Sequence, residues 1–247
     1  MPQLAIVIPA YNEQKLIGAC IEAVLKEVKR SGVDAEIVVV DNNSKDRTNE
    51  IASSYAGVRV VKEMQKGLVH ARACGFEAST APLVANIDGD TMMPAGWITT
   101  VMQAFDADAK LVCLSGPYFY YDLSVWQRFL VQLFYGAGYL LYLVARFVLR
   151  RGSMVQGGNF VFRRDAWQQV GGFDKTITFY GEDTDVAVRL SRVGKVRWTF
   201  ALPMHTTGRR LAEEGIVRTG WDYTVNFFWV TFSGKPHTKH YSDIRRE

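Results

Sequence analysis

Residues 82–90 read Pro82-Leu83-Val84-Ala85-Asn86-Ile87-Asp88-Gly89-Asp90, an apolar run that ends in two aspartates one residue apart. A short run rich in aliphatic residues predicts a buried strand over 83–87. Magnesium and manganese prefer hard oxygen ligands and usually bind through one or two carboxylates plus substrate phosphates. The stretch therefore indicates a site for a metal-bound diphosphate, although Asp-Gly-Asp is also ordinary turn chemistry.

Strands and helices alternate through the first 90 residues around this run. Strands are predicted at 4–9, 36–40, 58–61 and 83–87, and helices at 13–30, 46–55 and 68–78. Such alternation predicts an α/β fold with right-handed βαβ units and a mostly parallel sheet covered by helices on both faces. Ligands of such sheets bind beyond the carboxyl ends of the strands. We expect the polar residues that follow these strands to share one cleft; they are Tyr11, Asn12, Glu13, Asp41, Asp88 and Asp90.

The composition limits the class of protein. A chain of 247 residues with 48% apolar residues is sufficient for one large domain with a substantial core. The formal net charge of +4 is mild and its cations are dispersed, so no nucleic-acid partner is expected. Cys20, Cys74 and Cys113 are far apart, which is typical of a reduced, cytoplasmic protein. A glycine fingerprint after the first strand and a P-loop are both absent, which disfavours dinucleotide oxidoreductases and P-loop enzymes.

Six short motifs occur in the order found in one enzyme family. They are Ile6-Val7-Ile8-Pro9-Ala10-Tyr11-Asn12-Glu13, Val38-Val39-Val40-Asp41-Asn42-Asn43-Ser44-Lys45-Asp46-Arg47-Thr48, Lys66-Gly67-Leu68-Val69-His70-Ala71-Arg72-Ala73-Cys74-Gly75, Asp88-Gly89-Asp90, Gly157-Gly158-Asn159-Phe160 through Gly171-Gly172-Phe173-Asp174, and Gly181-Glu182-Asp183-Thr184-Asp185. With these motifs the chain resembles family 2 glycosyltransferases of the Rossmann-like GT-A fold, from residue 4 to about residue 205. The resemblance implies a metal-dependent enzyme, with Mg²⁺ or Mn²⁺ as cofactor. Such an enzyme transfers a sugar, with inversion, from a nucleotide-diphosphate sugar (a UDP-sugar in most relatives) to an acceptor hydroxyl.

The resemblance also implies roles for single residues at the donor site. The residues implied to contact the nucleotide sugar are Pro9, Tyr11, Glu13, Asp41, Arg72, Asp88 and Gly89. Among them, Asp41 would accept a hydrogen bond from the base and Asp88 would contact the ribose, whereas Asp90 would bind the cation. Many relatives carry a second aspartate where this chain has Asn42, so the identity of the base stays open.

Glu182 and Asp183 precede a segment with helical spacing of its apolar residues. A helix N-terminus stabilises a carboxylate by about 0.3–1 kcal/mol, which alone could explain these acids. The resemblance implies instead that Asp183, beside Glu182, is the general base that deprotonates the acceptor hydroxyl. Asp185 is expected to pair with Arg189, four residues further on. His205 would be either a second protein ligand of the cation or a surface histidine.

An apolar segment over 126–151 interrupts the α/β pattern. Gln132 is the one strongly polar residue between Phe129 and Ala145, and arginines stand on both sides. A spanning helix needs about 20 apolar residues, so this segment is a marginal span and is better suited to the membrane surface. A second aromatic stretch, 221–232, also has helical spacing. Both could instead be core or dimer-interface helices. Membrane contact would imply a lipid acceptor, such as a polyprenyl phosphate or a lipid-linked saccharide.

We therefore predict one GT-A catalytic domain over 1–247, with an aromatic-rich helical insertion and a C-terminal helix. Its expected parts are a nucleotide-sugar-binding half (1–95), an acceptor-side half with the apolar helix (96–210), and an aromatic helix with a basic tail (211–247). Its expected role is in lipid-linked or cell-envelope glycan synthesis, on a saccharide or lipid-linked acceptor. The expected location is cytoplasmic, at the inner face of the cell membrane if membrane contact exists, and a homodimer is also open.

Two alternatives differ in what the site does. A polyprenyl-phosphate sugar synthase would share the fold and differ in its acceptor. A non-catalytic protein that binds sugar nucleotides, or a scaffold, would not need the full set of acids. The presence of Asp88, Asp90 and Asp183 argues against that second alternative.

Overall fold

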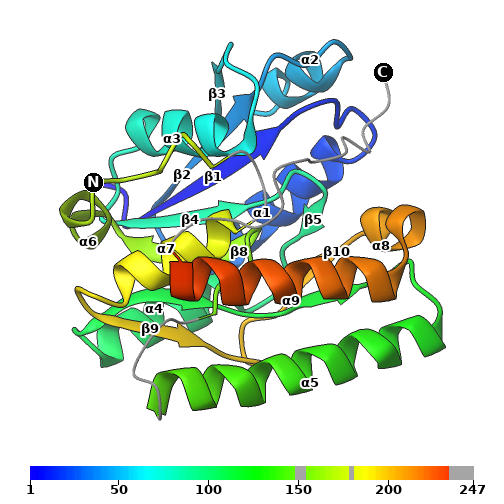
Figure 1. Ribbon diagram of the computed structural model, residues 1–247. Helices are drawn as coiled ribbons and strands as arrows, with labels where there is room; N and C mark the ends of the chain where they lie inside the picture. Colours follow the sequence, from blue (N-terminus) through cyan, green and yellow to red (C-terminus); the bar gives the residue numbers. More distant parts are fainter. Residues whose placement is uncertain (148–153, 178–180, 234–247) are drawn as a thin grey trace.

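A seven-stranded sheet forms the centre of the computed structural model, which describes residues 1–147, 154–177 and 181–233 (Figure 1). In spatial order its strands are β3 (Val58–Lys62), β2 (Ala35–Asp41), β1 (Leu4–Ala10), β4 (Leu83–Ile87), β8 (Asn159–Arg163), β6 (Leu111–Ser115) and β9 (Lys195–Trp198). Strand β8 is antiparallel to β4 and β6, whereas all other neighbouring pairs in this sheet are parallel. The predicted α/β fold with a mostly parallel sheet is confirmed.

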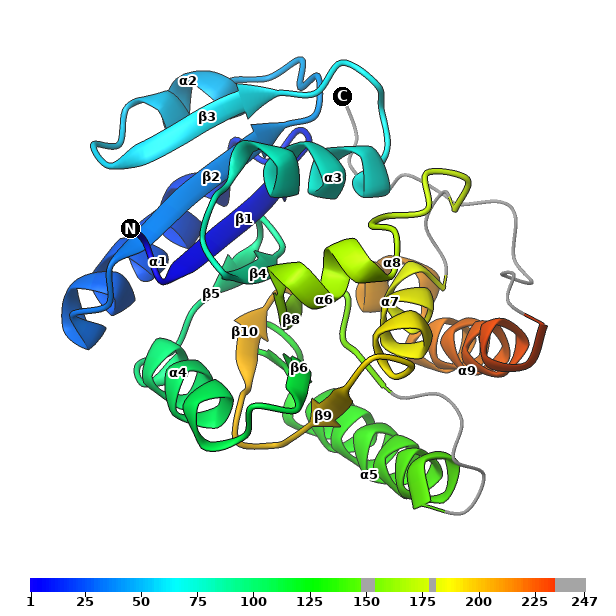
Figure 2. The same cartoon turned by 90° about the vertical axis from the view of Figure 1, so that its left-hand side faces the viewer.

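Helices cover both faces of this sheet, as Figure 2 shows. One face packs against α1 (Ile17–Ser31), α2 (Thr48–Ser53) and α4 (Trp97–Ala107). The other packs against α3 (Leu68–Ala78), α6 (Arg164–Gln169) and α7 (Glu182–Leu190). The sequence of β1 is continuously apolar because both of its faces are buried. Successive side chains of a strand point to opposite faces, so Ile6 and Ile8 lie in the core on one side of the sheet and Val7 in the core on the other.

A smaller sheet joins segments that are far apart in the sequence. It contains β5 (Thr91–Met92), β10 (Met204–Thr206) and β7 (Tyr118–Tyr120). Strand β5 begins directly after the Asp-Gly-Asp motif, and Thr206 of β10 is paired with Thr91 of β5. This pairing places the residues that follow β10 next to the Asp-Gly-Asp motif.

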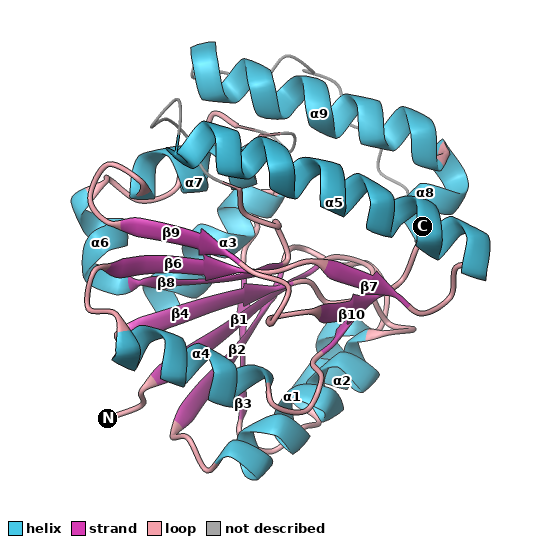
Figure 3. Ribbon diagram, turned by 90° about the horizontal axis from the view of Figure 1, so that it is seen from below, coloured by secondary structure: helices cyan, strands magenta, loops and turns pink. Residues whose placement is uncertain are grey.

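Three helices complete the described part of the chain: α5 (Val125–Phe147), α8 (Arg209–Glu214) and α9 (Ile216–Ser233). Figure 3 shows α5 and α9 running side by side. The ring of Tyr139 on α5 lies 5.7 Å from that of Trp198 on β9, which attaches α5 to the edge of the large sheet. The predicted apolar helix is confirmed up to residue 147, and residues 148–151 and the predicted basic tail lie outside the described residues. None of the helices in the described ranges combines the length and hydropathy needed to cross a membrane.

The predicted start of the first helix, at Glu13, is wrong by four residues. The backbone amide of Glu13 donates to the Thr48 hydroxyl at 2.8 Å, and that of Gln14 donates to Asp46 at 3.0 Å. Two side chains more than 30 residues away thus hold the backbone of residues 13 and 14 in the segment before the helix. Helix α1 consequently starts at Ile17.

The approach of α3 to the sheet depends on Gly75. A Cβ at this position would lie 2.2 Å from Val7 Cγ1 and 2.9 Å from Val40 Cγ2. Gly75→Ala should therefore lower the free energy of unfolding by about 1–3 kcal/mol through overpacking, although alanine is the better helix former.

The matched control for this substitution is Gly136→Ala in α5. Apart from its chain neighbours and the backbone of its own helix, no described atom lies within 4 Å of the Cβ that this change would add, so stability should be unchanged or slightly raised. Chemical denaturation followed by circular dichroism measures both variants. Equal stability of the two would contradict the packing at Gly75.

Candidate active site

One cleft brings together residues from several parts of the chain. Arg72 comes from α3, Asp88 and Asp90 follow β4, and Glu182 and Asp183 open α7. The structure therefore gathers five of the residues that the sequence singled out. The remaining wall includes residues of the smaller sheet, of the connection after β10 and of the C-terminal helices, namely Tyr118, Tyr120, Thr206, Thr207, Arg209, Thr219 and Tyr223.

Arg72 lies buried at the centre of this arrangement, with a relative exposure of 1%. Its guanidinium forms ion pairs with Glu182 and, at 3.2 Å, with Asp88 Oδ1, and it donates to the carbonyl of Gly157. Burial alone would lower the pKa of Arg72, but attraction to the two carboxylates raises it above its ordinary value. The side chain is therefore charged and links the Asp-Gly-Asp motif to the start of α7.

The two acids at the start of α7 differ in their surroundings. Glu182 is buried, and its Oε1 has no hydrogen-bond partner in the described part of the chain. Burial raises the pKa of Glu182 to about 7, against the opposing effect of Arg72. Asp183 Oδ1 accepts from the backbone amide of Thr184 at 2.8 Å. Its Oδ2 lies 3.7 Å from the position that a Cβ on Gly157 would take.

The environment of Asp183 makes its carboxylate more basic than a carboxylate in water. Loss of contact with water raises the pKa of its carboxyl group, and the amide of Thr184 offsets part of that rise. Its side chain lines the cleft and is partly exposed. Only Oδ1 of this carboxylate accepts the Thr184 amide, so Oδ2 can accept a proton from a bound hydroxyl.

Asp88 is held on its other side by Tyr118, a residue that no sequence motif marked. The Tyr118 hydroxyl donates to Asp88 Oδ2 at 2.7 Å, and burial raises the pKa of Tyr118 well above its usual range. A Cβ on Gly158 would lie 1.9 Å from the Tyr118 hydroxyl and 2.1 Å from Asp88 Oδ2. Gly158 is therefore required by this close approach.

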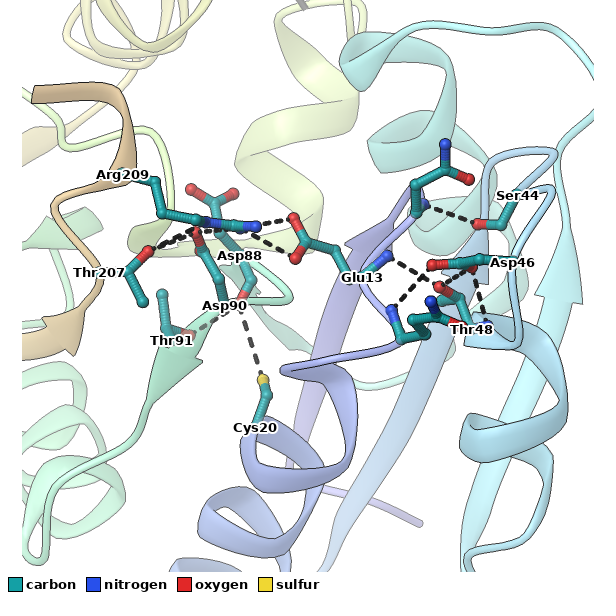
Figure 4. Close-up of polar contacts among 12 residues, drawn as sticks. Glu13, Cys20, Ser44, Asp46, Thr48, Asp88, Asp90, Thr91, Thr207 and Arg209 are labelled. Atoms are coloured by element: carbon teal, nitrogen blue, oxygen red, sulfur yellow. Dashed lines mark hydrogen bonds and ion pairs between the residues drawn. The ribbon is translucent and has the colours of Figure 1, made fainter. Parts of the chain in front are cut away.

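Asp90 and Glu13 both form ion pairs with Arg209, as Figure 4 shows. The Arg209 guanidinium donates to Asp90 Oδ2 at 2.8 Å and to both Glu13 carboxylate oxygens at 2.9 Å. Thr207 also donates to Asp90 Oδ2, at 3.2 Å. Partial burial would lower the pKa of Arg209, but the two carboxylates raise it. Asp90 Oδ1 makes no hydrogen bond within the described ranges.

Five of the residues expected to contact the nucleotide sugar do not line this cleft. Pro9, Tyr11 and Glu13 lie in or just after β1, Asp41 ends β2, and Gly89 follows β4. Asp41 accepts from the amide of Ser44 at 3.0 Å and from the side chain of Asn49 at 3.1 Å, so one of its oxygens binds the loop after β2 and the other binds α2. Lys66 Nζ donates to the Tyr11 hydroxyl at 2.9 Å. Asn42 instead ties two loops together, because its side chain accepts from the amide of Gly67 at 2.7 Å.

His205 lies elsewhere. It is the middle residue of β10, between the cleft-lining Thr206 and the buried Met204, and its ring lies 5.4 Å from that of Phe119. Alternate residues of a strand point to opposite sides, so His205 does not line the cleft. Within the described ranges, no group of three or more histidine, cysteine, aspartate or glutamate side chains could hold a metal ion.

A mostly parallel sheet with carboxylates gathered beyond its strands is the architecture of the GT-A glycosyltransferases. The chain belongs to glycosyl transferase family 2, whose family model matches residues 5–171. A second model, described as the N-terminal domain of galactosyltransferase, matches residues 148–210.

Individual relatives match parts of this chain. The chain is 28% identical to EpsJ, an uncharacterized glycosyltransferase of Bacillus subtilis (strain 168), over 128 residues that cover 50% of this chain and 36% of the relative. It is 32% identical to an undecaprenyl-phosphate 4-deoxy-4-formamido-L-arabinose transferase of Edwardsiella ictaluri (strain 93-146), over 115 residues that cover 44% and 35% of the two chains. The matches thus span little more than a third of the length of either relative.

A solved structure supports the fold. The mannosyltransferase PcManGT from Pyrobaculum calidifontis, in complex with GDP-Man and Mn²⁺, superposes with a TM-score of 0.66 at 19% identity. The superposition covers 88% of this chain and 62% of that one. At this identity the likeness shows the fold, and the GT-A fold predicted from the motifs is confirmed.

Arg72 offers a direct test of the ion pairs in the cleft. Arg72→Met should lower the free energy of unfolding by about 3–5 kcal/mol, because it leaves Glu182 buried without a counter-charge. Adding Glu182→Gln removes that charge, so the double variant should regain part of the loss. Chemical denaturation of the three proteins measures the difference. A double variant no more stable than Arg72→Met would contradict the assignment of the cost to an uncompensated charge on Glu182.

Proposed function

We propose that this chain transfers a sugar from a nucleotide-diphosphate sugar to an acceptor hydroxyl, with inversion at the anomeric carbon and with UDP as the expected nucleotide. The observation that carries the proposal is the meeting of Asp88, Asp90 and Asp183 in one cleft. The first two supply carboxylates for the donor and a cation, and the third has the properties of a base. Family membership and the GDP-Man complex of the structural neighbour support a nucleotide-sugar donor.

A divalent cation, Mg²⁺ or Mn²⁺, fits the donors that the cleft offers. Asp90 presents an oxygen without a hydrogen-bond partner among the described residues, and such cations bind through one or two carboxylates plus diphosphate oxygens. Asp90 would hold the cation, and Asp88 would contact the ribose. When bound, the cation would neutralise charge on the leaving diphosphate. The Mn²⁺ in the complex of PcManGT supports this use of a divalent cation.

The chain's own residues account for the remaining chemistry. The acceptor oxygen forms a bond to the anomeric carbon while the bond from that carbon to the diphosphate oxygen breaks, and Asp183 takes the hydroxyl proton. Attack from the side opposite the diphosphate inverts the anomeric centre. The Thr184 amide holds Asp183 Oδ1. Arg72, paired with both Glu182 and Asp88, would keep the base at a constant distance from the donor.

The acceptor is proposed to be a saccharide or a lipid-linked molecule of cell-envelope glycan synthesis. The Edwardsiella ictaluri relative is named as a transferase for undecaprenyl phosphate, which supports the lipid class. A polyprenyl-phosphate sugar synthase is the second candidate, and it would use the same donor site with a phosphate oxygen as the acceptor.

Asp183→Asn should reduce kcat by about a hundredfold or more, because an amide cannot accept the proton. Affinity for the nucleotide should be nearly unchanged. Asp185→Asn is the matched control, since the Asp185 carboxylate pairs with Arg189 at 2.9 Å and does not line the cleft. Transfer assays with a panel of nucleotide sugars, combined with calorimetric titration of the nucleotide, measure both quantities. Wild-type turnover by Asp183→Asn would exclude Asp183 as the base.

Asp90→Ala should weaken nucleotide-diphosphate binding by about tenfold or more in the presence of Mn²⁺, equivalent to about 1.4 kcal/mol. In EDTA the variant and the wild type should bind alike, because the lost interaction is with the cation. Isothermal titration under the two conditions distinguishes these cases. Undiminished binding in Mn²⁺ would argue against Asp90 as the cation ligand.

A further inference from the structure

Helix α5 is apolar on both its inner and its outer side. Tyr135 and Tyr142 face the protein and are buried. The opposite side carries large apolar residues at helical spacing, namely Trp126, Phe129, Leu133, Leu140 and Val144, of which Trp126, Leu133 and Leu140 are 63–66% exposed. A surface helix of a soluble domain ordinarily presents polar and charged residues there. The outer side of α5 is therefore unusual for a surface in contact with water alone.

Helix α9 adds a second exposed apolar side next to the first. It runs beside α5 in Figure 3, and a Cβ on its Gly220 would lie 3.5 Å from the ring of Phe134 on α5. Trp221, Phe228 and Trp229 of α9 are 68%, 40% and 50% exposed. We call the exposed apolar residues of these two helices the α5–α9 face.

The charges around α5 match an anionic surface. Residues 123–164 contain no aspartate or glutamate, and arginines stand at 128, 146, 150 and 151, on both sides of the apolar run. Basic residues next to an anionic bilayer each contribute about 1 kcal/mol to its attraction. Tryptophan rings favour the level of the lipid headgroups. A self-complementary dimer through the same face would bring two such basic flanks together, which disfavours a second copy as the occupant.

We propose that the α5–α9 face binds the surface of a bilayer that contains anionic lipids. Its exposed rings and aliphatic side chains enter the headgroup region, and Arg128 in the first turn of α5 contacts lipid phosphates. The helices lie along the bilayer without crossing it, because α5 stays packed on the sheet through its buried tyrosines.

This orientation has a consequence for the acceptor. Thr219 and Tyr223 of α9 line the cleft, so docking through α9 brings the cleft next to the bilayer. The acceptor is then a lipid-linked phosphate or saccharide at that surface. The acceptor class rests on the proposed function, whereas binding to the bilayer does not.

Vesicle flotation with the full chain tests the proposal, with no donor or acceptor present. Vesicles of phosphatidylcholine alone are compared with vesicles that also contain phosphatidylglycerol. The wild-type protein should float with the mixed vesicles, and added salt should weaken that binding. The double variant Leu133→Gln/Leu140→Gln should bind at least about tenfold more weakly, because two apolar side chains no longer leave water.

Met64→Gln is the matched control, because Met64 is 68% exposed in the loop between β3 and α3 and should have no effect on vesicle binding. Unchanged thermal unfolding of the double variant confirms that it is folded, as expected for two exposed positions. Failure of the wild type to bind mixed vesicles, or equal binding by the double variant, would overturn the proposal. A dimer in solution that dissociates in the double variant would assign the face to self-association instead. Calorimetric nucleotide binding on the same samples reports separately on the donor site.

Discussion

The buried charge of Arg72 is the constraint on which the geometry of the cleft depends. Removing a guanidinium from water costs several kcal/mol, and that cost must be offset by close partners. Glu182, Asp88 and the carbonyl of Gly157 supply them from three separate segments. The Arg72 guanidinium therefore determines how far the start of α7 lies from the Asp-Gly-Asp motif. The close approach of α3 to β1 at Gly75 in turn determines where Arg72 lies.

The pairing of charges also distinguishes the acids from one another. Glu182 and Asp88 share Arg72, and Asp90 is paired with Arg209. Within the described residues Asp183 lines the same cleft without an ion pair, and its carboxylate is held by the backbone amide of Thr184. Burial raises the pKa of Asp183 above its ordinary value, and Arg72 lowers it only in part. An acid outside an ion pair suits a base better than one that is paired. The distribution of arginines thus supports the proposed division of roles.

Much of the fold could be predicted from the sequence because its signals are local. The bounds of α3 and β4 follow from an apolar run and a helical period within the segments themselves. The start of α1 could not be predicted, since Asp46 and Thr48 act on it from more than 30 residues away. The same limit applies to the site. Motifs indicated Arg72, Asp88 and Asp183, but the hydrogen bond from Tyr118 depends on tertiary packing, and the side to which His205 points depends on strand register.

Thermal-shift measurements with nucleoside diphosphates, in Mn²⁺ or in EDTA, test most directly the claim that the carboxylates of this cleft form a metal-dependent donor site. A ligand at a hundred times its dissociation constant adds about 2.7 kcal/mol to the stability of the protein it binds, which is readily detected. The account predicts that one nucleoside diphosphate raises the unfolding midpoint in Mn²⁺ and much less in EDTA. An unfolding midpoint that no nucleotide raises in Mn²⁺ would contradict it.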